Sequence, residues 1–346
     1  MAIFRKRQYN FTSISKRYRV FLTKTIFSKA DSTIRGDIML LRYIGKRILQ
    51  TLIVVIVVTI IAFSLVRMAP GNPARLMLNE DASDEAVAAM EVYLGLDKPL
   101  PVQYFKYLSG LVQGDFGTSF SYRQPVLKLI GQTIGFTLRL SLLSTLLALC
   151  ICIPLGIIAG SHRGKLPDFL SMFVALTGQS MSAVWMAVLL IFVFSVKLGW
   201  LPAVGGIGFI AYILPMITIG YPMAAELTRV ARSGMIDTLS EDHITATYAK
   251  GVSRLSINWK YAFRNALCPM ITLVGLSMSA HIAGSVVVES IFALPGIGQL
   301  MYNAINRRDY PVVQGVLVIV AIMFALMNLA VDIINSFVDP RISLEG

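Results

Sequence analysis

The chain has 346 residues, of which 55% are hydrophobic and 14% charged, and its mean hydropathy is +0.69. A soluble protein would carry about 25% charged residues, so the composition argues against a soluble globular protein and predicts an all-α polytopic membrane protein. The formal net charge of +12 would indicate nucleic-acid binding in a soluble protein. In a membrane protein, an excess of Lys and Arg is first examined for what it says about which loops face the cytoplasm.

The N-terminal segment, residues 1–47, is basic and precedes the first long apolar stretch. Phe11, Ile14, Tyr18 and Phe21 recur at helical spacing among lysines and arginines, which is typical of an amphipathic helix lying on anionic lipid. An extension that only enforces topology fits the same residues equally well. No cleavable signal peptide is expected, because the first apolar stretch is too long for a signal-peptide core.

Six apolar stretches are long enough to cross a bilayer, which takes roughly 20 apolar residues in a helix. None of the six contains Asp, Glu, Lys or Arg. They predict about six transmembrane helices within a membrane domain over residues 48–334, followed by a C-terminal tail, residues 335–346. The stretches cover residues 48–66, 140–160, 169–196, 207–225, 266–288 and 312–331.

The basic residues indicate which side of the membrane each loop faces. An even number of spans puts both termini on one side, and placing them in the cytoplasm puts most of the Lys and Arg inside, as the positive-inside rule requires. Both termini are therefore expected in the cytoplasm. Because topology accounts for the basic excess, nucleic acid is not an expected partner.

The longest loop, residues 67–139, is then external. Within it Ser83 is placed to cap a helix whose first turn carries Asp84 and Glu85, and Gly95 is placed to end that helix. The loop is expected to form a small external cap, too short to be a separate ligand-binding domain.

The sequence offers no catalytic or metal-binding constellation. His162, His243 and His281 fall in three different segments without ligand spacing. Cys150 and Cys152 are two apart on one predicted helix and therefore point to different faces. The segment GSHRGKL lacks the glycine spacing of a phosphate-binding loop. We expect no catalytic residue, no metal site and no ATP site in this chain.

Some polar residues inside the apolar stretches are candidates for a translocation pathway. His281 lies near the centre of the fifth stretch, four residues before Ser285 on the same face. A polar residue inside a membrane indicates a pathway, although a hydrogen bond to a neighbouring helix explains it as well. Ser180, Ser182 and Trp185 are further candidates, on the interior face of the third stretch.

Charged residues at the ends of the stretches suggest ion pairs. Glu226 and Arg229 are three residues apart at the inner end of the fourth stretch and are expected to pair at the interface. Glu289, at the outer end of the fifth stretch, is placed to pair with Arg307 or Arg308.

One long polar segment, residues 232–266, separates the fourth and fifth stretches on the cytoplasmic side. Its residues 238–241, TLSE, read as a capping box, and Asp242 adds charge at the start of a helix. This helix is expected to run for about ten residues to Lys250. Gly251 then suits the left-handed residue that ends it.

A second helix is expected to begin near Ser253 and to lead into the fifth span. Two helices joined at a glycine bend would let one face dock into a partner's groove, while the continuation into the membrane transmits movement. An interfacial helix that packs on the lipid headgroups fits the pattern equally well. The apolar stripe of this second helix consists of Leu255, Trp259, Ala262, Phe263, Ala266 and Leu267.

The segment EDHITATYAKG, followed by RNALCPMI, resembles the cytoplasmic loop of permease subunits of bacterial ABC importers, in the dipeptide/oligopeptide/nickel permease variant. Thr245, Ala246, Thr247 and Gly251 occupy its core positions, with Thr245 in place of the common Glu and Thr247 in place of an Ala. The resemblance covers about residues 40–342. It includes the segments MAPGNPARLM, YLGLDKPLPVQYFKYL, GDFGTSF, LGWLPAVG, VVVESIFALPGIGQLM and RRDYPVVQG.

The resemblance implies an ABC type I importer-like permease fold in the bacterial cytoplasmic (inner) membrane. Besides the lipid bilayer, it implies three kinds of partner: a homologous second permease subunit, two ATP-binding subunits and an extracytoplasmic substrate-binding protein. ATP and Mg would be bound by the partner subunits, so the chain itself would not be an enzyme.

The implied cargo is a small peptide, a di- or oligopeptide or a glutathione-like one, and nickel or a metal chelate is the alternative within the same family. A stand-alone secondary transporter or channel is a further alternative. That alternative predicts ionisable groups in the membrane centre or repeated half-sites. The apolar stretches contain no acidic or basic side chain except His281.

The resemblance also gives roles to two groups of residues. Residues 239–267 would couple to an ATPase, with Glu241, Asp242, Thr245, Ala246, Thr247, Ala249, Lys250, Gly251 and Arg254 as the coupling residues. The external gate, or a contact with the binding protein, would involve Glu289, Arg307, Arg308 and Asp309.

Overall fold

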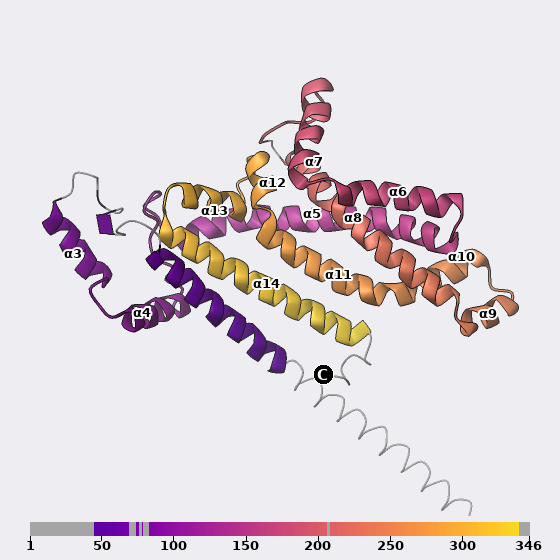
Figure 1. Cartoon of the computed structure of the whole chain (residues 1–346), viewed down its shortest axis with the longest axis horizontal. Coiled ribbons are helices and arrows are strands. Elements are labelled where there is room, and N and C mark those ends of the chain that lie inside the picture. The colour runs from indigo at the N-terminus through magenta and orange to yellow at the C-terminus, as the bar shows by residue number, and fades with distance from the viewer. Residues whose placement is uncertain (1–44, 69–73, 76–77, 79–82, 206–207, 339–346) are drawn as a thin grey trace, which may run out of the picture.

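The computed structural model of the chain is an elongated bundle of helices (Figure 1). It describes residues 45–68, 74–75, 78, 83–205 and 208–338, so the expectations for residues 1–44 and for the end of the tail lie outside the described residues. Within the described part, the one β contact is an isolated bridge between Thr118 and Pro125. The predicted all-α class is confirmed.

Four unbroken helices in the described part of the chain are long and apolar enough to cross a membrane. Two further pairs of helices, each joined at a bend, are also long and apolar enough, which gives up to six spans if each bent pair counts as one. This agrees with the six predicted. The unbroken helices are Gly45–Met68, α5 (Val126–Ser161), α8 (Ile210–Leu239) and α14 (Tyr310–Val338).

The third predicted span is not one continuous helix. α6 (Leu166–Ser180) is followed by α7 (Ala183–Leu190) and the π-helical η1 (Ile191–Lys197), and the two halves are bent by 101°. Met181 is extended, and the Ser182 hydroxyl accepts a hydrogen bond from the Trp185 N–H as the cap of α7. The serine cap satisfies one of the backbone N–H groups left free at the start of α7.

The fifth predicted span also differs from a single straight helix. It is entered through α10 (Arg254–Ser256) and η2 (Ile257–Ala262), continues as α11 (Phe263–Gly284) and is followed by the short α12 (Val286–Ile291). The path bends by 52° between Leu267 and Pro269. Proline explains the bend, because it lacks an N–H and its ring displaces the preceding turn.

The connecting elements leave the bundle at two ends (Figure 1). α5 and α8 end, and α11 begins, beside α9 (Asp242–Ala249); we call this the α9 end. α5 and α14 begin beside α13 (Ile297–Asn306), at what we call the α13 end. The first long loop contains α3 (Asp84–Leu94), which begins and ends as predicted, and α4 (Leu100–Val112), which was not predicted.

α5 and α8 pack closely along small residues. A Cβ atom added at Gly156 would clash with the Cβ of Ala231, and one added at Gly160 would clash with the Cβ of Met235. Lipid tails are as apolar as leucine, so helices in a membrane associate largely through such close backbone approach. The segment GIIAG is therefore a packing motif that brings α5 against α8.

Candidate functional site

The connection between α8 and α11 forms an exposed surface at the α9 end. α8 runs through Leu239, so Thr238 lies inside α8 and is buried, and the predicted capping box is wrong. The helix continues because Met235 and Leu239 pack into the core between α5, α8 and α11. Glu241 occupies the N-cap position of α9 without a side-chain cap bond, and its carboxylate lies 2.9 Å from His243 Nδ1.

α9 ends where the sequence predicts. Lys250 is its C-cap residue, and Gly251 follows with φ +79°, in the left-handed region that favours glycine. Ile244 is fully buried and anchors α9 on the bundle. The remaining face of α9 is left open to a partner.

Seven of the nine predicted coupling residues lie in α9 or at its caps, whereas Gly251 lies in the turn that follows and Arg254 begins α10. Thr247 is half-buried and its hydroxyl donates to the His243 carbonyl oxygen at 2.8 Å. The exposed members of the set are Glu241, Asp242, Thr245, Ala246, Ala249, Lys250, Gly251 and Arg254.

The second helix of this connection departs from the predicted apolar stripe. It begins after Ser253 as expected, but η2 inserts a π turn, which shifts the register relative to a 3.6-residue period. Ile257 and Ala262 are consequently buried, whereas Leu255 is 73% and Trp259 49% exposed. The stripe is therefore wrong at its start, although its later members Ala262, Phe263 and Ala266 are buried.

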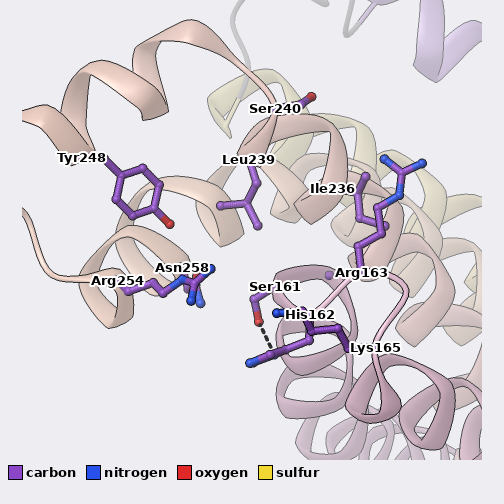
Figure 2. A pocket seen from close by; sticks show the side chains of 11 residues that line it. Ser161, His162, Arg163, Lys165, Ile236, Leu239, Ser240, Tyr248, Arg254 and Asn258 are labelled. Atoms are coloured by element: carbon purple, nitrogen blue, oxygen red, sulfur yellow. Dashed lines mark hydrogen bonds between the residues drawn. The ribbon is translucent and has the colours of Figure 1, made fainter.

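A pocket of about 370 Å³ lies between this connection and the short α5–α6 loop (Figure 2). Its walls come from α8 (Ile236 and Leu239), from Tyr248 of α9 and from Asn258 of η2. No acidic side chain is among its lining residues. Four of them are basic: His162, Arg163, Lys165 and Arg254.

An ion pair next to this pocket fixes the start of α6 against α8. Arg232 Nε and Nη2 donate to the two carboxylate oxygens of Asp168 at 2.6 and 2.8 Å, and the Gly164 N–H donates to the same carboxylate at 2.9 Å. Such bidentate pairs are among the stronger hydrogen bonds in proteins. This pair was not predicted from the sequence. The signal that could have indicated it is Asp168, an acidic residue in the first turn of a helix that leads into an apolar stretch.

At the α13 end the carboxylate of Glu289 is 1% exposed and accepts four hydrogen bonds. The Thr137 and Ser285 hydroxyls donate at 2.7 and 2.9 Å. The backbone N–H groups of Gly298 and Gln299, in the first turn of α13, donate at 2.7 and 3.2 Å. The expected pairing of Glu289 with Arg307 or Arg308 is wrong, because a helix N-terminus already compensates the charge.

Asp309 is also buried, and its carboxylate is held by hydrogen bonds within the chain. It accepts hydrogen bonds from the Ser119 hydroxyl and from the N–H groups of Phe120 and Ser121. It thereby ties the α13–α14 turn to the loop before α5. Arg307 and Arg308 are exposed, and the Arg307 guanidinium lies 5.3 Å from the ring centre of Tyr122.

The predicted pathway residues fall into two groups. Ser180, Ser182 and Trp185 lie at the α6–α7 break, where Trp185 is 65% exposed. His281 lies in α11, and its Nε2 atom is buried without a hydrogen-bond partner. Ser285 is buried at the α11–α12 junction, where its hydroxyl donates a hydrogen bond to the Glu289 carboxylate. No hydrogen bond joins these two described groups.

Two remaining expectations concern the spans themselves. Glu226 and Arg229 form no ion pair with each other among the described residues, and Arg229 is exposed. On the same helix Arg232, one turn after Arg229, pairs with Asp168 of α6. Cys152 is buried and Cys150 exposed, both as free thiols, so they point to different faces as predicted.

Comparison with known sequences identifies related proteins. Residues 152–344 match the family described as binding-protein-dependent transport system inner membrane component, and residues 40–141 match the N-terminal part of such membrane components. The glutathione transport system permease protein GsiC of Escherichia coli (strain K12) is 40% identical over 303 residues, covering 88% of this chain and 99% of that protein. GsiC of Salmonella typhimurium (strain LT2) is 39% identical with the same coverage.

Comparison with solved structures shows a related fold. An inward-facing structure of the MetNI methionine ABC transporter matches with a TM-score of 0.53 at 20% identity, covering 61% of this chain and 96% of that chain. A second crystal form of the same transporter gives 0.52, covering 62% and 97%. At this level of identity the likeness shows the fold alone.

Proposed function

The chain belongs to the family of binding-protein-dependent transport system inner membrane components and is a permease subunit of an ABC importer of the peptide/nickel type, and from this premise we propose that it carries small peptides, glutathione foremost. The support for glutathione is the name of the relatives that match nearly the whole chain. The chain would form half of the pathway, with a homologous second permease subunit forming the other half.

The α9 surface is the feature that carries the coupling proposal. α9 is anchored by the buried Ile244 and presents Thr245 and Ala246 to the outside. It joins through η2 to α11, whose helix continues into the membrane. A partner that moves α9 would therefore move α11 as well, because α9 packs against η2 and η2 continues into α11 without a break in the helix. We assign this partner as a cytoplasmic ATP-binding subunit, two of which would serve the pair of permeases.

This assignment places the α9 end in the cytoplasm, together with both chain termini. The α13 end then faces the extracytoplasmic binding protein. Arg307 and Arg308 are exposed there and are suited to contact it, whereas the burial of Glu289 and Asp309 gives those two side chains an internal role in positioning the gate. His281, with its unpartnered Nε2 atom, remains the best-supported pathway candidate.

The substrate proposal is tested with the complete importer in proteoliposomes. Addition of ATP is expected to drive uptake of glutathione in the presence of the binding protein, and excess unlabelled dipeptide or nickel competes only if the system accepts them. ATP-dependent nickel uptake without glutathione uptake would instead favour the metal-carrying branch of the family. Uptake without any ATP-binding subunit would contradict the importer assignment.

The coupling proposal is tested at Ala246. Ala246→Arg places a long cation on the exposed face of α9 without disturbing the buried Ile244 side, so the variant is expected to fold and to insert normally. It should lose most substrate-stimulated ATP hydrolysis and retain less of the ATPase subunit on purification. Ala246→Ser is the matched control, since it changes the same position with little added volume. Equal coupling in both variants contradicts the proposal.

A further inference from the structure

The pocket at the α9 end is lined by basic side chains and by no acidic one. His162, Arg163 and Lys165 lie in the short connection between α5 and α6, and Arg254 lines the pocket from α10 (Figure 2). The carboxylate nearest to them in sequence is Asp168, which is already paired with Arg232. The pocket is therefore an anion site by charge, with room of about 370 Å³, within the range of small-ligand sites.

Arg163, Lys165 and Arg254 give this pocket its permanent positive charge. Arg and Lys side chains are the groups that bind phosphate oxygens with short, charge-assisted hydrogen bonds.

The position of the pocket along the bundle indicates the source of the anion. α5 ends at Ser161 and α6 begins at Leu166, so the basic residues lie where apolar spans give way to a polar loop. This is the depth of the lipid headgroups, and basic pockets between membrane helices at this depth bind anionic headgroups.

An exposed apolar face follows the basic loop in sequence, along α6. It is formed by side chains at positions i, i+3, i+4 and i+7, which share one side of a helix. The rings of Phe169 and Phe173 stack with centroids 6.4 Å apart. The exposed fractions are 69% for Leu166, 66% for Phe169, 52% for Leu170 and 58% for Phe173.

We propose that the pocket binds the phosphate of an anionic membrane phospholipid, such as phosphatidylglycerol, whose acyl chains lie along this face of α6. Lys165 contacts the phosphate from one side and Arg254 from the other, and Arg163, whose side chain runs beside Ile236, adds positive charge at the edge of the pocket (Figure 2). The lipid then links the α5–α6 loop to the α10 end of the coupling connection. The inference needs the membrane location of the chain but neither its substrate nor its ATPase docking.

The test measures which lipids stay bound to the complete purified importer after detergent washing, by native mass spectrometry in an equimolar mixture of phosphatidylglycerol and phosphatidylcholine. Each basic residue near an anionic surface contributes about 1 kcal/mol, so removing two is expected to lower phosphatidylglycerol retention about tenfold or more. The test variant is Arg163→Gln with Lys165→Gln. The control is Lys128→Gln with Lys197→Gln. It removes the same charge from two exposed positions, one at the start of α5 and one at the end of η1.

Selective retention of phosphatidylglycerol that the test variant loses and the control keeps supports the site. Equal retention in wild type and test variant, or an equal loss in the control, overturns it. Millimolar inorganic phosphate and glycerol 3-phosphate form a second arm: displacement of the lipid by either would assign the pocket to a soluble phosphate compound instead. In a third outcome, phosphatidylglycerol binds the permease pair and is expelled when the ATP-binding subunits are added. That result would show that the pocket is a protein interface, and it also overturns the proposal.

Discussion

The Thr137 hydroxyl of α5 donates to Glu289 of α12 at 2.7 Å, although the two residues are 152 positions apart in the chain. The same Thr137 oxygen accepts the Ile297 N–H at 2.9 Å. One side chain thus joins α5 to both α12 and the start of α13. The elements that would shape the external gate are held to the bundle by a buried polar junction rather than by apolar contact alone.

Glu289→Ala is expected to destabilise this junction strongly. It leaves the Gly298 and Gln299 N–H groups without their acceptor, and each buried unsatisfied group costs about 1–3 kcal/mol. Glu289→Gln should fall between wild type and Ala, because its amide oxygen still accepts from one side while its NH₂ cannot accept from a backbone N–H. Thermal unfolding of the purified complex measures the order. Equal melting temperatures for Gln and Ala would show that the backbone donors do not matter.

Gly156→Leu is expected to disrupt the contact between α5 and α8. Even the first carbon of the new side chain clashes with Ala231, and overpacking costs typically 1–3 kcal/mol. Gly135→Leu is the control on the same helix, because a Cβ atom there meets nothing within 4 Å. The measurement is the yield of monodisperse protein after solubilisation. Comparable losses for the two variants would point to a general effect of helix composition.

Asp168 and Arg232 are expected to depend on each other. Asp168→Ala removes a carboxylate that is 7% exposed at its side chain and leaves Arg232 unpaired, at a cost of about 1.5–3 kcal/mol for a charged hydrogen bond. Combined with Arg232→Met, the second substitution should cost much less than it does alone. A double-mutant cycle on thermal stability checks this, and additive effects would show that the two side chains act independently.

Gly251 is expected to tolerate side chains in the order Asn, Ala, Val. Its Cβ position is open, with nothing within 4 Å, so the cost is that of the left-handed backbone at φ +79°. That cost is about 1 kcal/mol for Ala and more for a β-branched residue, whereas Asn adopts this region more readily. Substrate-stimulated ATP hydrolysis across the series measures the effect. An inverse order would mean that side-chain contacts at this position outweigh the backbone.

Several features follow directly from local sequence. The cap at Ser83, the stop at Gly95 and the bend at Gly251 each depend on residues within one or two helical turns, and the apolar stretches depend on composition over about 20 residues. These features were predicted, since local chemistry decides each of them. The burial of Ile244 was not predicted, although it is the one large aliphatic residue in residues 241–250.

Other features were decided by contacts between distant segments. Thr238 looked like a cap, but the packing of Met235 and Leu239 against α5 and α11 extends α8 past it. The π turn of η2 changes which side of the second helix is buried, and no periodic pattern in the sequence reveals it. The 101° break between α6 and α7 lies inside a continuous apolar stretch, where hydropathy gives no signal.

The sequence by itself determined the membrane class, the number of spans and the α9 loop, because hydropathy, charge and glycine positions act locally. Only the tertiary structure decided which partner each buried charge has. Glu289 accepts hydrogen bonds from Thr137 and from the start of α13 rather than pairing with Arg307 or Arg308. Asp168 pairs with Arg232. A buried carboxylate must be satisfied by whichever donors the fold brings to it, and the most distant of these, Arg232 and Thr137, lie 64 and 152 residues away along the chain.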